Sequence, residues 1–236
     1  MFDAGALAYD TYRPRYPSAM FDEIISVASL TPGSSAIDVG CGTGIGTIPL
    51  IERGLSVLGI EPSVTMAEIA RAKFGHAAQC VVCRFEDWKP GASVDLVVSF
   101  NSWHWIDPVV GVRRASDVLR PGGWLALMWT DVIQYGDPPF EQRLADRLGL
   151  GESNIFEQVT SCVRYVAEDT EFVERETLRH RFERQLDART YLDVIRTYGG
   201  QRDAGAEAVV EQLINEEFGG RIRKVEEAVV FLYQRR

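Results

Sequence analysis

No stretch of this 236-residue sequence approaches the roughly 18 consecutive apolar residues that a membrane-spanning helix needs. The first seven residues, Met1 to Leu7, include no lysine or arginine, so the start does not resemble a signal peptide. The four cysteines are too few for a disulfide framework in a chain this long. We therefore expect a cytoplasmic protein that uses no membrane and whose core needs neither disulfides nor metals.

The sequence also has fewer basic than acidic residues. The sequence holds 25 lysines and arginines against 34 aspartates and glutamates, which gives a formal net charge of −9. Only three of the basic residues are lysines: Lys73, Lys89 and Lys224. A dedicated nucleic-acid binder needs a basic face to contact phosphates, so the acidic balance speaks against that class, although it leaves room for a local basic patch.

Two of the cysteines, Cys80 and Cys83, form a C-x-x-C pair, but no second pair completes a zinc site. They lie in the apolar run 80–83, which is typical of a strand, and positions i and i+3 of a strand point to opposite faces. We interpret them as buried, inert thiols rather than as metal ligands or a redox pair. We expect no metal.

The first half of the chain alternates apolar strand-like runs with amphipathic helical runs, which is typical of a parallel α/β sheet. Ser18 and Ser63 are predicted N-caps, and Asp107-Pro108 is a helix-start signal. A turn is expected at 121–123. The expected strands are 35–39, 55–60, 79–84, 95–100 and 124–129, and the expected helices are 18–30, 44–53, 63–74 and 107–119.

The second half has weaker periodicity. We expect short helices at 138–148 and 154–159, a strand at 176–185, helices at 190–198 and 204–217, and a last strand at 227–233. Together these predict an α/β fold: a Rossmann-like, seven-stranded, mostly parallel sheet with helices on both faces and a small helical cap inserted after strand five. The expected segments are 1–34 (lid and helix), 35–130 (cofactor core), 131–175 (cap) and 176–236 (strands and helices that complete the sheet and the acceptor side).

The strongest motif is the segment from Ile37 to Gly46, in which four glycines at alternate positions follow a buried strand and open a helix. Glycine permits positive φ and lets the backbone approach a ligand closely. Open α/β sheets bind ligands at the carboxyl ends of their strands, where this loop is expected. The G-x-G-x-x-G spacing of dinucleotide-binding proteins is absent, because Ile45 or Thr47 occupies its last position.

An acidic residue follows the second expected strand. Glu61 lies 21 residues beyond Gly40, where a carboxylate can accept hydrogen bonds from both hydroxyls of a ribose. The alternative is a surface glutamate at a strand end. We favour the ribose role because the loop and the acid occur together at the right separation, although several nucleosides carry two free ribose hydroxyls.

These residues carry a family resemblance. The motifs Asp38-x-Gly40-x-Gly42-x-Gly44, Glu61, Asp95-Leu96-Val97 and Leu119-Arg120-Pro121-Gly122-Gly123 resemble those of the class I S-adenosylmethionine-dependent methyltransferases and cover about residues 35–130. The segments Tyr9 to Pro17, Phe85 to Trp88 and Trp103 to Trp105 are similar to the bacterial small-molecule branch near trans-aconitate methyltransferase. The shared fold is broad, so the resemblance bears on the cofactor more than on the acceptor.

The resemblance implies S-adenosylmethionine as the cofactor and S-adenosylhomocysteine as its product. It implies that the glycine loop holds the methionine part, that Glu61 binds the ribose, and that Pro62 forms an edge of the adenine pocket. The family's acidic position after strand three is Arg84 here, which leaves the backbone of Phe85 and the side chain of Glu86 as adenine candidates. The expected cofactor-binding residues are Asp38, Gly40, Cys41, Gly42, Thr43, Gly44, Glu61, Pro62, Phe85, Glu86 and Asn101.

The loop after strand four is the expected acceptor side. His104 is the candidate catalytic residue, as a general base or as a group that orients the acceptor; the alternative is a packed, structural histidine. Trp103 and Trp105 are candidate substrate-binding residues or core anchors. Tyr12 is a third substrate candidate, because the opening tyrosines either fold over the cofactor or pack the first helix.

We therefore predict an enzyme that transfers a methyl group to a small-molecule acceptor on oxygen, nitrogen or a carboxyl group. The partners expected are a small molecule, with no nucleic acid and no membrane, and the oligomeric state is open. The alternatives are an RNA methyltransferase of the same fold, a cofactor-binding protein that no longer transfers methyl groups, and a nicotinamide oxidoreductase, which the missing G-x-G-x-x-G disfavours.

Overall fold

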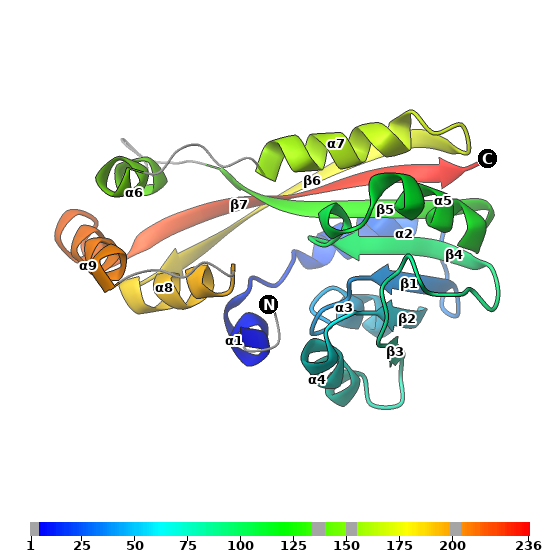
Figure 1. The fold of residues 1–236 in the computed structure, drawn as a ribbon, viewed down its shortest axis with the longest axis horizontal. Helices are drawn as coiled ribbons and strands as arrows, with labels where there is room; N and C mark the ends of the chain where they lie inside the picture. Colours follow the sequence, from blue (N-terminus) through cyan, green and yellow to red (C-terminus); the bar gives the residue numbers. More distant parts are fainter. Residues whose placement is uncertain (1–4, 134–139, 150–154, 199–203) are drawn as a thin grey trace. The chain divides into compact units, whose positions relative to one another are not determined.

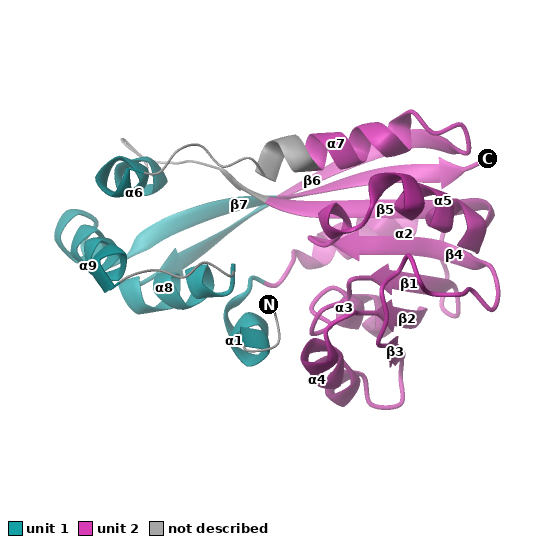
Figure 2. Cartoon of the chain, in the orientation of Figure 1, with its two compact units in different colours: residues 1–14, 131–153, 181–227 teal, residues 15–130, 154–180, 228–236 magenta. Residues whose placement is uncertain are grey.

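The computed structural model describes residues 5–133, 140–149, 155–198 and 204–236, with the backbone alone at 131–133 and 155–158. The chain forms two compact units (Figure 2). Unit 1 comprises residues 1–14, 131–153 and 181–227, and unit 2 comprises residues 15–130, 154–180 and 228–236. The expected cap segment, 131–175, is shared between them. The predicted helix starts at Pro138 and Asn154 lie outside the described residues.

The strands form one seven-stranded sheet in the order β3-β2-β1-β4-β5-β7-β6, which confirms the predicted sheet. Four neighbouring pairs, β1·β2, β2·β3, β1·β4 and β4·β5, are parallel. The last strand in the sequence, β7, runs antiparallel to its neighbours β5 and β6 (Figure 1). The strands are β1 Ser35–Val39, β2 Ser56–Ile60, β3 Gln79–Val81, β4 Val94–Phe100, β5 Leu119–Ile133, β6 Phe172–Leu186 and β7 Ile222–Arg235.

Helices cover both faces of the sheet in unit 2, because successive strand residues point to opposite sides. Odd-numbered residues such as Ile37, Val97 and Leu127 join a core with α5 Pro108–Val118 and α7 Ile155–Ala167. On the other face, Phe100 packs against Phe21 of α2 Ser18–Val27. The helices α3 Thr47–Glu52 and α4 Val64–Phe74 carry a second apolar cluster around Cys41 and Cys80.

The sheet has a switch point between β1 and β4. From β1 the chain builds outward to β2 and β3, then returns to place β4 on the other side of β1. Parallel α/β sheets bind ligands in the crevice outside the carboxyl ends of the strands at such a point. The segments that follow these two strands are the glycine loop and the loop that begins at Asn101, so the fold predicts a site there.

Unit 1 has its own core, which includes Phe140, Tyr191 and Leu213. Its helices are α1 Ala6–Tyr12, α6 Phe140–Leu148, α8 Ala188–Arg196 and α9 Ala204–Gln212, the last extended by the π-helical turn η3 Leu213–Glu217. Arg13 joins α1 to α8: its guanidinium lies 3.7 Å from the ring centroid of Tyr198, and its Nε donates to Thr197 Oγ1 at 2.8 Å.

Several predicted boundaries were wrong. The cap of α2 is Pro17 rather than Ser18, because the fixed φ of proline already suits a helix start. The third strand ends at Val81, so Cys83 lies outside it and is half-buried, whereas Cys80 is buried. The expected turn at 121–123 is an irregularity inside β5, where Val94 pairs with Leu119 but Leu96 pairs with Trp124. The seventh helix is longer than predicted and ends at Ala167.

Other local predictions are confirmed. The Ser63 hydroxyl accepts a hydrogen bond from Met66 N at 3.2 Å and caps α4. The Asp107 carboxylate accepts hydrogen bonds from Val109 N and Val110 N and caps α5, whose first residue is Pro108. None of the described helices combines the length and the apolar composition that crossing a bilayer requires.

Candidate cofactor and acceptor site

The glycine loop follows β1 and has the backbone that the sequence predicted. Gly40, Gly42 and Gly44 all have positive φ, at 69°, 56° and 84°, a region that residues with side chains rarely enter. A Cβ on Gly40 would lie 2.6 Å from Ser102 Cβ, so Gly40 lets β1 and β4 come together. A Cβ on Gly42 would meet only Met66 Sδ, at 3.9 Å. The loop is therefore open at Gly42 and closely packed at Gly40.

Glu61 links the glycine loop to the turn after β2. Its side chain is buried, with 6% of the residue exposed. One carboxylate oxygen accepts a hydrogen bond from Gly42 N at 2.9 Å and the other from Ser63 N at 2.8 Å. These bonds place a carboxylate beside the open part of the loop. Each carboxylate oxygen can accept a second bond, so Glu61 can hold the loop and bind hydroxyls at once.

Asp38, the buried acid of β1, has one oxygen that lacks a partner. Oδ2 accepts a hydrogen bond from Thr47 Oγ1 at 2.6 Å, whereas Oδ1 has no hydrogen bond, and the residue is 1% exposed. Burial, with a smaller contribution from the negative charge of Glu61, raises the pKa of Asp38 to about 7 against the opposing hydrogen bond from Thr47. A buried carboxylate oxygen without a donor, next to an open glycine loop, fits the ammonium group of an amino acid.

Cys41 and Thr43, the other loop residues, point away from solvent. Cys41 lies in the cluster under α4, and its Sγ is 3.6 Å from Cys80 Sγ. The hydrogen bond with Cys80, together with burial, raises the pKa of Cys41 well above its usual value, which agrees with an inert thiol. Thr43 is fully buried. Any contact of these two residues with a ligand is therefore expected through the backbone.

Asn101 fixes the end of β4. It has a positive φ of 53°, which asparagine tolerates better than most residues. Its Nδ2 donates to Tyr16 Oη and to Thr130 Oγ1, both at 3.1 Å, and its Oδ1 accepts from Thr130 N at 2.8 Å. Both amide hydrogens are thus engaged within the protein. The predicted cofactor contact of Asn101 stays a prediction. In the structure its side chain connects the end of β4 to Thr130 of β5.

Replacing Asn101 by Ala should destabilise the protein by about 2–3 kcal/mol, since it removes several hydrogen bonds of about 1 kcal/mol each and keeps a strained backbone. For a chain of this size that lowers the melting temperature by roughly 4–12 °C. Thermal unfolding followed by circular dichroism measures it. Ser29, which shares the positive φ at 51°, supplies the control: Ser29→Ala keeps the backbone strain but breaks no cross-strand bond, and an equal loss in both variants would contradict the account.

Ser102, which the sequence did not single out, ties the two loops together. Its hydroxyl donates to Val39 O at 2.6 Å and lies 2.5 Å from the hydroxyl of Ser99, which also bonds Val39 O. Val39 immediately precedes the glycine loop. The carboxyl ends of β1 and β4 are therefore held at a fixed separation, with Gly40 packed against Ser102.

The turn after β3 holds the adenine candidates. Phe85 is buried and its ring packs 6.0 Å from that of Trp103. Arg84, which replaces the family's acid, donates to Glu86 Oε1 at 2.7 Å. Burial raises the pKa of Glu86, but the hydrogen bond from Arg84 and other bonds outweigh it, and the net pKa is lowered. Glu86 is thus an ionised, partnered acid. Pro62 is exposed beside Glu61, and the adenine contacts of all three residues remain predictions.

The two tryptophans in the loop after β4 differ in their burial. The loop contains the 3-10 helix η2 Trp103–Trp105. Trp103 is 1% exposed and belongs to the main core of unit 2, which favours the core-anchor interpretation over a substrate contact. Trp105 is 64% exposed and its ring centroid lies 5.1 Å from that of His104. Trp105 is therefore the tryptophan that can meet an acceptor.

His104 contacts Trp105 and also Trp129, a residue that the sequence analysis did not single out. Trp129 of β5 donates from its indole Nε1 to His104 Nδ1 at 3.1 Å. Burial lowers the pKa of His104 below its ordinary value of 6.5. His104 is half-buried and its Nδ1 is held by Trp129, so its role on the acceptor side stays a prediction and the packed, structural histidine stays the alternative. Tyr12, the remaining substrate candidate, lies on α1 in unit 1.

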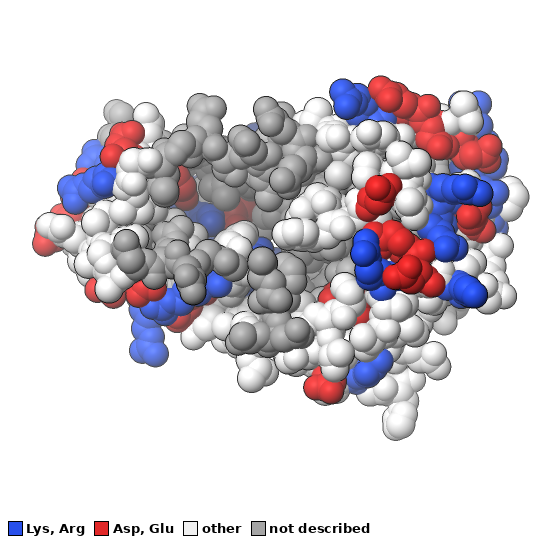
Figure 3. All heavy atoms as spheres, in the orientation of Figure 1, with Lys and Arg blue, Asp and Glu red and all other residues white. Residues whose placement is uncertain are grey.

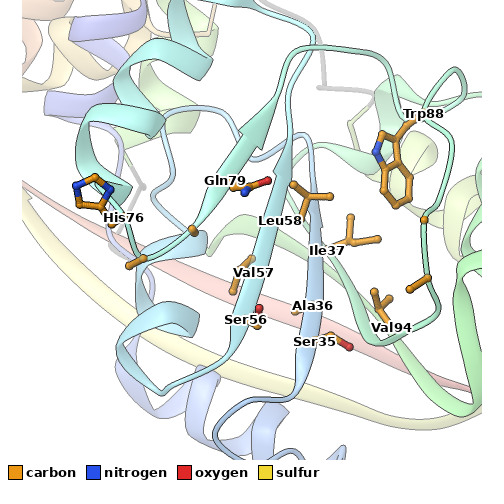
Figure 4. Close-up of a pocket in the computed structure, with 14 residues that line it drawn as sticks. Ser35, Ala36, Ile37, Ser56, Val57, Leu58, His76, Gln79, Trp88 and Val94 are labelled. Carbon is orange, nitrogen blue, oxygen red and sulfur yellow. The ribbon is translucent and has the colours of Figure 1, made fainter.

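A separate pocket of about 480 Å³ lies in unit 2 (Figure 4). Its walls are residues from the first halves of β1 and β2, including Ser35, Ile37 and Val57, together with Trp88 and Val94. The glycine loop and Glu61 follow the carboxyl ends of the same strands. The pocket and the glycine loop are therefore different places in unit 2. Among the described residues no cluster of histidine, cysteine or acidic side chains is suited to a metal ion.

Comparison with known proteins identifies the family. Residues 37–127 match the methyltransferase domain model. An uncharacterized methyltransferase of Mycobacterium tuberculosis (strain H37Rv) is 34% identical over 128 residues, which cover 54% of this chain and 51% of the relative. An uncharacterized methyltransferase of Geobacillus sp. (strain WCH70) is 30% identical over 157 residues, which cover 64% of this chain and 69% of the relative. The chain belongs to the class I S-adenosylmethionine-dependent methyltransferases, and it spans about half the length of the Mycobacterium relative.

Solved structures agree with the fold. A protein described as a type II methyltransferase of Anaeromyxobacter dehalogenans aligns with a TM-score of 0.65 at 23% identity over 94% of this chain and 97% of its own. The geranyl diphosphate C-methyltransferase of Streptomyces coelicolor A3(2), solved with Mg²⁺, geranyl diphosphate and S-adenosylhomocysteine, aligns with a TM-score of 0.53 at 16% identity over 93% and 79%. At these identities the likeness concerns the fold.

Proposed function

We propose that this protein transfers a methyl group from S-adenosylmethionine to a small-molecule acceptor by in-line displacement. The observation that supports the proposal most is the arrangement around Gly42: an open glycine with positive φ, whose N–H is held by the buried Glu61, next to the partnerless oxygen of Asp38. A ribose with two free hydroxyls and an amino-acid ammonium are the groups that these two acids suit. S-adenosylmethionine carries both.

Each candidate residue then has a separate role in binding the cofactor. Asp38 binds the ammonium group, Glu61 binds the ribose while it holds the loop, and Pro62, Phe85 and Glu86 contact the adenine. The sulfonium of S-adenosylmethionine supplies a methyl group that is already electrophilic. The protein therefore has to align the acceptor and exclude water, and rigid strand ends such as those joined by Ser102 serve alignment.

A small molecule is favoured over RNA as the acceptor by the charge of the surface. Acidic and basic side chains are mixed on the face of the described residues that Figure 3 shows. Several arginines of the described residues are paired with acids, as in Arg84–Glu86 and Arg120–Asp95, both at 2.7 Å. An RNA-directed enzyme needs basic groups free to meet phosphates. The related fold of geranyl diphosphate C-methyltransferase binds a small molecule, which is compatible with this proposal.

The finer placement of the protein is also a proposal. The opening tyrosines and the Trp103-His104-Trp105 segment support the bacterial small-molecule branch that resembles trans-aconitate methyltransferase. His104 and the exposed Trp105 form the acceptor side. The four free cysteines support a reducing, cytoplasmic location.

Cofactor affinity should depend on pH through Asp38. Its raised pKa of about 7 means that the free protein holds Asp38 largely protonated at lower pH. Binding an ammonium group favours the ionised form, so affinity for S-adenosylhomocysteine should rise roughly tenfold between about pH 6 and 8 and then level off. Calorimetry in buffers of different ionisation enthalpy should show proton release near neutrality. Asp38→Asn should bind more weakly with a flat profile, and a wild-type profile that falls with pH would rule out the assignment.

Methyl transfer itself tests the proposal. The protein is incubated with S-adenosylmethionine carrying a labelled methyl group and a panel of small carboxylates, alcohols and amines, with transfer RNA as a separate acceptor. We expect label in a small-molecule product and none in RNA. Label in the RNA fraction alone would overturn the small-molecule acceptor, and tight S-adenosylhomocysteine binding without any transfer would support a cofactor-binding protein instead.

A further inference from the structure

The hydrogen bond between Trp129 and His104 links the core of unit 2 to the acceptor loop. Trp129 lies on β5 and is 5% exposed. Its ring packs edge-on against Phe231 of β7, with the centroids 6.1 Å apart. His104 lies on η2, and its Nδ1 is 3.1 Å from the indole Nε1. A rigid residue of the sheet thus holds one edge of the histidine ring.

The bond has a direction. An indole N–H can donate but cannot accept. The nitrogen that it meets, His104 Nδ1, must therefore offer a lone pair, and the single proton of the neutral ring must sit on Nε2. An imidazolium would carry protons on both nitrogens and would oppose the Nδ1–H to the indole N–H. Since Trp129 is buried in the core of unit 2 and packs against Phe231, turning its ring away from that contact would disturb the packing.

We propose that Trp129 is a positioning residue that keeps His104 as a neutral Nε2–H donor, so that His104 binds an oxygen of the acceptor and does not remove its proton. This inference rests on the proposed function, because it concerns the acceptor of that reaction. It defines the acceptor by chemistry: a small molecule that presents a hydrogen-bond-accepting oxygen, such as that of a carboxylate, carbonyl or phosphate group. The burial that lowers the pKa of His104 acts in the same direction as the bond.

Nitrogen NMR of the whole protein tests the proton position without any methyl transfer. In the ¹⁵N-labelled chain the three histidines are assigned with His104→Gln, and long-range proton–nitrogen spectra at about pH 7 separate a protonated from an unprotonated ring nitrogen. We expect His104 to show a protonated Nε2 and a hydrogen-bonded, unprotonated Nδ1. Trp129→Phe should move the Nδ1 resonance toward that of a free imidazole. Trp124→Phe, which removes the other tryptophan of β5, should leave it in place. A protonated Nδ1 in the wild type would overturn the proposal.

Two substitutions of His104 separate the donor from a base. Glutamine can place an N–H near the position of Nε2 but cannot titrate, whereas asparagine can reach only the position of Nδ1. With an acceptor found in the panel, His104→Gln should keep the rate within about tenfold, and His104→Asn should lose about tenfold to a hundredfold. If His104 instead acted as a general base, both substitutions would lower the rate of methyl transfer, by roughly 10²–10⁴-fold. Equal, large losses would therefore overturn the proposal. If no panel member is methylated, the small-molecule function fails, while the NMR result still decides the proton position.

Discussion

Replacing Gly42 by Val should abolish measurable binding of S-adenosylhomocysteine in a chain that remains folded. The backbone at Gly42 has a φ of 56°, where a β-branched residue is strained by about 1–3 kcal/mol. The space beside it is open, since a Cβ would meet only Met66 Sδ at 3.9 Å. We therefore expect the new side chain to collide with the ligand rather than with the protein. We expect affinity to fall by at least about a hundredfold, or 2.7 kcal/mol.

Gly75 supplies the matched control for this substitution. Its φ of 57° is nearly that of Gly42, and a Cβ there would meet nothing within 4 Å, but it lies at the C-cap of α4, outside the glycine loop. Gly75→Val should cost similar stability, seen as a melting temperature lowered by a few degrees, about 2–4 °C per kcal/mol. It should bind S-adenosylhomocysteine like the wild type. If both variants bind normally in calorimetry, the ligand does not lie on this loop.

Replacing Glu61 by Gln should weaken binding of S-adenosylhomocysteine by roughly tenfold to a hundredfold, because bonds to a charged acceptor contribute about 1.5–3 kcal/mol. The structure adds a second reason. Both carboxylate oxygens accept backbone bonds, from Gly42 N and Ser63 N. A glutamine has one oxygen, so its amide N–H₂ must face one of these N–H groups. The substitution therefore disturbs the loop as well as the ribose contact.

Glu52, an exposed acid at the end of α3 in the same unit, serves as the charge control. Glu52→Gln removes one negative charge from unit 2 without touching the loop, so affinity should stay within about twofold, the effect expected of a distant, screened charge. Calorimetry on both variants at the same salt concentration decides. An unchanged affinity in Glu61→Gln would remove Glu61 from the ribose site.

The arrangement of the glycine loop and Glu61 was predictable because its signals are local or follow a strand rule. Gly40 to Gly44 is one continuous motif, and Glu61 comes at the end of the next strand, so the parallel pairing of β1 and β2 brings Glu61 to Gly42. The sequence also predicted the seven strands, since each apolar run is bounded by polar or turn residues. The long strands β6 and β7 were underestimated, because their ends carry charged residues.

The contacts that shape the acceptor side were not predictable in the same way. The partners Trp129 and His104 are 25 residues apart, Ser102 and Val39 are 63 apart, and Asn101 and Tyr16 are 85 apart. No periodicity or spacing in the sequence predicts such pairs, because they depend on how β1, β4 and β5 pack against one another. Trp103 and Trp105 show the same limit: they are two residues apart in one loop, yet one is core and the other is exposed.

Titration calorimetry of the wild-type chain with S-adenosylhomocysteine, repeated with NAD, tests the central claim most directly. The claim is that the loop around Gly42, with Asp38 and Glu61, holds an S-adenosyl amino acid. It predicts saturable binding of S-adenosylhomocysteine with one site per chain, lost in Gly42→Val, and no binding of NAD. Binding of NAD, or the absence of any heat with S-adenosylhomocysteine from a folded chain, would contradict it.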